Sequence, residues 1–100
     1  MTLKEFQRHI ETLYGERDEA RGKAGTFLWL VEEMGELAEG IRTGSRESME
    51  EEFADVLAWL VSVANLEGVD MEKAVTAKYG SGCPKCKETP CRCQDPTKLR

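Results

Sequence analysis

The chain has 100 residues, a formal net charge of −5, 40% hydrophobic residues and 33% charged residues. This length allows one domain with a modest core, and a helical chain of this size often completes its core by oligomerising. The composition indicates a soluble globular protein, excludes a general nucleic-acid binder and offers no membrane span. The first ten residues carry charges throughout, unlike a signal peptide, so we expect a cytoplasmic protein.

The segment from residue 1 to residue 80 is predicted to be helical, because no proline precedes Pro84 and apolar residues recur at helical spacing. Thr2 and Glu5 form a capping box at the start of a first helix. A polar loop is expected over residues 15–25. Its cations Arg17, Arg21 and Lys23 are either solvated or within reach of a phosphate.

A second helix is expected over residues 26–42, followed by a break at Gly44 and Ser45. Its apolar stripe consists of Leu30, Met34, Leu37 and Ile41. Ser48 and Glu51 are a second candidate capping box. The third helix then has a stripe formed by Phe53, Leu57, Leu60 and Ala64.

Gly68 is expected to end the third helix, and Asp70 to cap a short fourth helix that ends near Tyr79. The prediction is therefore an all-α fold of four to five helices with an antiparallel central hairpin, completed by oligomerisation. We divide the chain into a helical domain, 1–80, and a cysteine-rich, loop-like tail, 81–100.

Acidic residues are arranged symmetrically about the expected turn at Gly44. Glu33 and Asp55 each lie eleven residues from Gly44, and Glu36 and Glu52 each lie eight residues from it. In an antiparallel hairpin the four carboxylates would converge beside the apolar seam, where they would repel one another or hold protons without a cation. Oxygen ligands with no His or Cys nearby favour Mg²⁺ or Mn²⁺. The alternative is a solvated acidic helix face.

Two tryptophans follow the same symmetry, since Trp29 and Trp59 each lie fifteen residues from Gly44. Either ring could stack on a nucleotide base, although aromatic residues of a core or an interface would give the same pattern. The single histidine, His9, is expected to lie on a helix surface and not to bind metal.

The tail contains all four cysteines, in the pattern C-x₂-C-x₄-C-x-C formed by Cys83, Cys86, Cys91 and Cys93. Four thiolates suit a closed tetrahedral Zn²⁺ site with a structural role, held by one chain or shared across a dimer. Two disulfides, or a reduced tail without order, remain as alternatives.

The segments FLWLVEEMGELAEGIR and EEFADVLAWLVSVANLEGVDMEKAV resemble the MazG family of all-α nucleoside triphosphate pyrophosphohydrolases. The family pattern E-E-x-x-E followed by E-x-x-D corresponds here to residues 32–36 and 52–55. The resemblance implies that Glu33, Glu36, Glu52 and Asp55 bind Mg²⁺, and that Glu32 orients or deprotonates the attacking water. It also implies that Asn65 and Lys78 face the nucleotide.

The activity implied by this resemblance is hydrolysis of a nucleoside triphosphate to the monophosphate and pyrophosphate by a homodimer or a dimer of dimers (a homotetramer). Bridging metal ions make it favourable to bring a triphosphate into an acidic site. One rival hypothesis is a helical dimerisation module that binds a partner and carries a structural zinc knuckle. Another is a MazG-like fold that binds nucleotide or metal with little turnover.

Overall fold

The computed structural model describes residues 1–94, which form three helices and no strand within that range. Helix α1 spans Leu3–Thr43, α2 spans Arg46–Glu67 and α3 spans Met71–Tyr79. None of these helices is long and apolar enough to cross a membrane. The last six residues of the predicted tail lie outside the described residues, and residues 80–94 consist of turns and bends.

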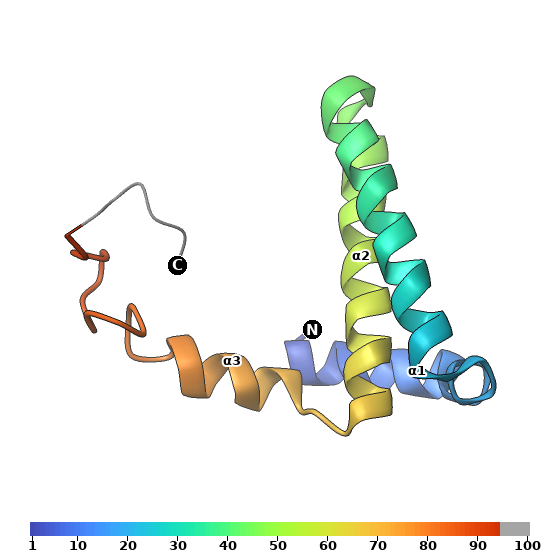
Figure 1. The fold of residues 1–100 in the computed structure, drawn as a ribbon, viewed down its shortest axis with the longest axis horizontal. Coiled ribbons are helices and arrows are strands. Elements are labelled where there is room, and N and C mark those ends of the chain that lie inside the picture. Colours follow the sequence, from blue (N-terminus) through green and yellow to red (C-terminus); the bar gives the residue numbers. More distant parts are fainter. Residues whose placement is uncertain (95–100) are drawn as a thin grey trace.

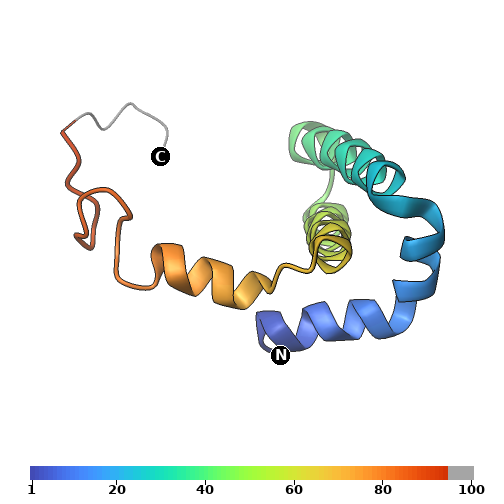
Figure 2. The same cartoon turned by 60° about the horizontal axis from the view of Figure 1, so that its bottom comes forward.

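Helix α1 is bent sharply, so its two halves act as separate helices (Figure 1). The bend lies at Gly22, where φ is 87° and ψ is 169°, a conformation that residues with a side chain rarely adopt. The N-terminal half runs crosswise to the hairpin that the C-terminal half makes with α2 (Figures 1 and 2). The predicted loop over residues 15–25 is therefore wrong, because only Gly22 leaves the helical conformation. The described residues thus form three helices, one of which is bent into two segments, where four to five helices were expected.

The turn between α1 and α2 is short and fixed by its own polar groups. Gly44 donates its N–H to the carbonyl oxygen of Gly40 at 2.7 Å, and a β-carbon at Gly44 would lie 2.7 Å from that oxygen. Ser45, not Ser48, caps α2, since its hydroxyl accepts the N–H of Ser48 at 3.2 Å. The expected cap at Ser48 is wrong because α2 begins nearly a full turn earlier.

The remaining helix ends agree with the sequence. Thr2 and Glu5 form the predicted capping box, with bonds of 3.1 Å and 2.7 Å. Gly68 ends α2 in the left-handed conformation, and Asp70 caps α3 by accepting the N–H of Lys73 at 3.0 Å. Helix α3 ends at Tyr79, as expected.

A buried amide holds the N-terminal half of α1 against the junction of α2 and α3. The Gln7 side-chain amide donates to Asn65 Oδ1 at 2.9 Å and to the carbonyl oxygen of Val69 at 2.7 Å. Its oxygen accepts the N–H of Met71 at 2.9 Å. Since Gln7 is only 8% exposed, losing these partners would leave a buried polar group unpaired. This network ties the N-terminal half of α1 to the segment that joins α2 and α3.

The core is small for 94 described residues. Its buried apolar side chains are Ile10, Leu30, Val61 and Ala64. Two apolar stripes on the hairpin instead remain half exposed, with side chains between 38% and 58% accessible. On α1 the stripe comprises Phe27, Val31, Met34 and Ile41, and on α2 it comprises Phe53, Leu57 and Leu60.

We expect Gly22→Ala to destabilise the fold by about 1–3 kcal/mol, because the bend requires a positive φ. A β-carbon there would meet no atom within 4 Å, so the cost would be backbone strain alone. Gly35→Ala is the matched control, since Gly35 is helical and equally unobstructed. That change should stabilise by up to about 1 kcal/mol. Chemical denaturation measures both, and equal effects would contradict our account of the bend.

Candidate metal centre and nucleotide cleft

The hairpin brings three carboxylates together at its seam. One oxygen from each of Glu33, Glu36 and Glu52 lies within 4.8 Å of the others, and no Lys or Arg among residues 1–94 forms an ion pair with them. Glu33 and Glu36 lie one turn apart on α1, and Glu52 faces them from α2. Asp55 lies outside this group of three, although its charge acts on Glu33. The predicted convergence is therefore seen for three of the four residues.

The cluster is electrostatically unsatisfied. One oxygen of Glu33 and one of Glu52 are buried without a hydrogen-bond partner. Desolvation, followed by the charges of Glu36 and Asp55, raises the pKa of Glu33 to about 7 from its ordinary value of 4.5. A shared proton, a water molecule or a cation between carboxylate oxygens that face one another would satisfy them, and a cation also removes their charge repulsion. The residues present thus fit a hard cation such as Mg²⁺, which binds oxygen ligands.

The two tryptophans predicted to pair do so. The rings of Trp29 and Trp59 stack with centroids 5.9 Å apart and planes inclined by 15°. Trp59 also carries the guanidinium of Arg21, whose Cζ lies 4.9 Å from the ring centroid. Trp59 is thereby held between an aromatic and a cationic neighbour.

A cleft of about 330 Å³ opens beside Asp55. Asp55 and Trp59 line it from α2, and cations from the N-terminal half of α1 also line it. The full lining is Tyr14, Arg17, Asp18, Arg21, Asp55, Ala58, Trp59 and Ser62. None of the three clustered glutamates lines this cleft, and its link to them is Asp55, whose charge acts on Glu33. A space of this size with cations, an aromatic ring and carboxylates has chemical features suited to a phosphorylated nucleoside.

Asp18 is a residue of this cleft that the sequence analysis did not identify. It is 3% exposed, one of its oxygens accepts from Arg21 at 2.9 Å, and the other has no partner. Arg21 also donates to Thr26 at 3.3 Å, across the bend. The sequence feature that could have indicated Asp18 is its spacing of three residues from Arg21. This spacing predicts an ion pair only if the segment is helical.

The other predicted site residues lie elsewhere. Glu32 is exposed on α1, outside the group of three carboxylates. Asn65 is bonded to Gln7, and lines a second cleft of about 300 Å³. Lys78 lies on α3, which runs away from the hairpin, with its Nζ 5.5 Å from the ring centroid of Tyr79 (Figure 1). Lys23 pairs with Glu67 at 3.3 Å, so it is engaged with α2.

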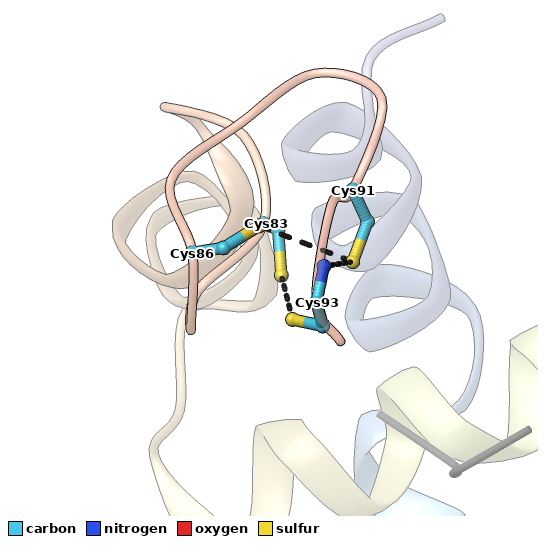
Figure 3. A group of neighbouring side chains, drawn as sticks. All are labelled: Cys83, Cys86, Cys91 and Cys93. Carbon is cyan, nitrogen blue, oxygen red and sulfur yellow. Dashed lines mark hydrogen bonds between the residues drawn. The ribbon is translucent and has the colours of Figure 1, made fainter. Parts of the chain in front are cut away.

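The four cysteines of the tail also converge (Figure 3). Their sulfur atoms all lie within 4.8 Å of one another, and all four are free thiols. The backbone N–H of Cys86 lowers the pKa of the Cys83 thiol to about 6, whereas bonds with the Cys91 and Cys83 thiols raise the pKa of Cys93 to about 12. The tail is therefore a second cluster of groups that could hold a metal ion.

The family model of the MazG nucleotide pyrophosphohydrolase domain matches residues 21–87. The chain therefore belongs to the MazG family, whose domain is all-α and acts on nucleotides. The match includes the hairpin with Glu33, Glu36 and Glu52 and ends within the cysteine tail. The boundary at residue 80 between the helical domain and the tail therefore stays a prediction. A comparison with curated proteins finds no match.

We expect stability to depend on pH through Glu33. Between pH 4.5 and about 7 the folded state holds a proton that the unfolded state has released, so this group's contribution falls as pH rises. Glu33→Gln keeps a neutral donor at every pH. In the presence of a chelator, its free energy of unfolding should rise relative to wild type across this window. A pH-independent difference would contradict the raised pKa.

Proposed function

We propose that this chain is a magnesium-dependent hydrolase that cleaves nucleoside triphosphates between the α- and β-phosphates. Water adds to phosphorus, the anhydride bond breaks, and the products are the nucleoside monophosphate and pyrophosphate. The observation that carries this proposal is the pair of buried, unpartnered oxygens on Glu33 and Glu52, inside a segment that matches a nucleotide pyrophosphohydrolase family.

The metal would be held by Glu33, Glu36, Glu52 and Asp55, with Mn²⁺ as an alternative to Mg²⁺. When bound, such an ion neutralises phosphate charge, polarises the phosphorus centre and makes water a better nucleophile. We assign to Glu32, from its place in the family pattern, the role of orienting the water or accepting its proton. Glu32 is exposed, so its carboxylate is accessible to water.

The cleft beside Asp55 offers the remaining contacts. Arg17 and Arg21 supply positive charge for phosphate oxygens in a protein whose net charge is −5. The ring of Trp59 already contacts the ring of Trp29 and the guanidinium of Arg21. A nucleotide base that stacks on Trp29 or Trp59 would therefore bind at the edge of this stack or displace one of these neighbours. Asn65 and Lys78 remain proposed substrate contacts, although Asn65 would first have to give up its bond to Gln7.

We propose that the working form is a homodimer or a dimer of dimers. The apolar stripes on α1 and α2 leave seven large side chains between 38% and 58% accessible on the hairpin that carries the carboxylates. A patch of this kind commonly marks a protein–protein interface. A second copy would bury these stripes and supply the core that a single chain lacks.

Glu36→Gln tests the metal site directly, because it removes a charge while keeping size and helix propensity. Pyrophosphate release from a panel of nucleoside triphosphates should fall by more than about tenfold, since even residues outside the ligand shell commonly cost that much in metal affinity. Millimolar Mg²⁺ should raise the melting temperature of wild type and have less effect on the variant.

Glu39→Gln is the matched control for this test, because Glu39 lies one turn further along α1, outside the group of three carboxylates. It should retain wild-type turnover and Mg²⁺ stabilisation. Full activity of Glu36→Gln would rule out the proposed centre. If folded, magnesium-loaded wild type releases no pyrophosphate from any nucleotide, a partner-binding helical module becomes the better interpretation.

The oligomer is tested by Phe53→Ser. Phe53 is 54% exposed in the single chain, so its truncation should cost the isolated fold little, whereas aromatic anchors are among the strongest interface contacts. Light scattering coupled to size exclusion should find a dimer or tetramer for wild type and at least tenfold weaker association for the variant. Wild type that stays monomeric at every concentration would refute the proposal.

A further inference from the structure

The cysteine tail lies apart from the acidic cluster and has no role in the reaction proposed above. It follows α3 and extends away from the hairpin (Figures 1 and 2). We propose that Cys83, Cys86, Cys91 and Cys93 of one chain bind a single Zn²⁺ ion that folds residues 83–93 into a structural knuckle. This inference is independent of the hydrolase assignment, because none of its ligands lies on α1 or α2.

The sulfur positions match a tetrahedral zinc site. Zinc–sulfur bonds of about 2.3 Å place the sulfur atoms of a regular tetrahedron about 3.8 Å apart. Here Cys83 Sγ and Cys93 Sγ are 3.8 Å apart, and Cys86 Sγ and Cys91 Sγ are 4.0 Å apart. All four sulfur atoms fall within 4.8 Å of one another, so the other edges exceed the required length by at most about 1 Å (Figure 3).

The backbone around the sulfurs is arranged to stabilise thiolates. The N–H of Arg92 donates to Cys86 Sγ at 3.3 Å, and the N–H of Cys93 donates to Cys91 Sγ at 3.4 Å. The loop also closes on itself, since Lys87 donates its N–H to the carbonyl oxygen of Cys83 at 2.7 Å. Such N–H···S bonds support the bound sulfurs from the outer shell of a metal site and orient them.

With all four cysteines present as free thiols, nothing other than a bound metal can supply the free energy needed to order this segment. Residues 83–93 contain no Val, Ile, Leu, Met or aromatic residue, so no apolar core can form there. Lys87 is held at a φ of 66°, in the left-handed region that costs free energy for a residue with a side chain. A metal ion bound by four thiolates provides that free energy through coordination, as in other small zinc modules.

The donor set selects the metal and its role. Four soft sulfur ligands favour zinc over the hard cations suited to the carboxylate cluster. Because all four tetrahedral positions are filled by protein, no site is left for water or substrate, and the ion is structural. The chain would therefore carry two chemically distinct metal centres, an oxygen site on the hairpin and a sulfur site in the tail.

Elemental analysis of the full chain, purified under reducing conditions, tests the proposal. We expect about one zinc per chain, retained through gel filtration. Cobalt substitution should give the sulfur-to-metal charge-transfer bands and visible absorption of a tetrahedral thiolate site. Cys86→Ser removes one ligand and should lower zinc affinity more than tenfold, while helical circular dichroism stays unchanged because the ligand lies outside the helices.

Two matched controls accompany this variant. Lys85→Ala, between two ligands, and Glu36→Gln, in the acidic cluster, should both keep one zinc. Half an equivalent of zinc in wild type would refute a site within one chain. Iron, disulfide-linked sulfurs under reducing conditions, or four free thiols after reconstitution with Zn²⁺ would each overturn the proposal.

Discussion

The short turn at Gly44 and Ser45 is the constraint on which the site depends. The turn holds α1 and α2 antiparallel in one register. That register stacks Trp29 on Trp59, which are equally distant from Gly44, and brings Glu33 beside Glu52, which lies about one turn nearer to Gly44. A one-residue change in the turn would rotate one helix by about 100° relative to the other and separate both pairs. The site is therefore a property of hairpin register.

Register alone would not gather acids at a seam, because like charges oppose it. The position of Glu33 in the cluster raises its pKa to about 7, and one oxygen each of Glu33 and Glu52 has no hydrogen-bond donor. Such groups lower stability in the metal-free protein and are typical of functional sites, where affinity for a ligand offsets the loss. The cysteine tail is a similar case with sulfur ligands, because its four thiols lie close enough together to bind one cation.

Helical periodicity and symmetry about Gly44 predicted the helical hairpin. They also predicted the tryptophan pair and the convergence of three of the four carboxylates, because these features depend only on the helical repeat and a central turn. The bend in α1 could not be predicted in this way. Residues 15–25 are polar but still form a helix, and a spacing pattern does not reveal a single positive φ at Gly22. Without a helix there, the sequence also offered no reason to expect that Asp18 is buried and lines a cleft together with residues of α2.

The half-exposed stripes connect the proposed oligomer to the chemistry. Apolar surface contributes about 25 cal/mol per Å² when buried, so covering seven large side chains in that oligomer would offset repulsion within the acidic cluster. The same cover would exclude water from the flanks of Glu33 and Glu52 and strengthen their interaction with a cation. Stability and metal affinity would then increase together. In the proposed oligomer, a chain with so small a core could therefore tolerate unpaired carboxylates at its hairpin seam.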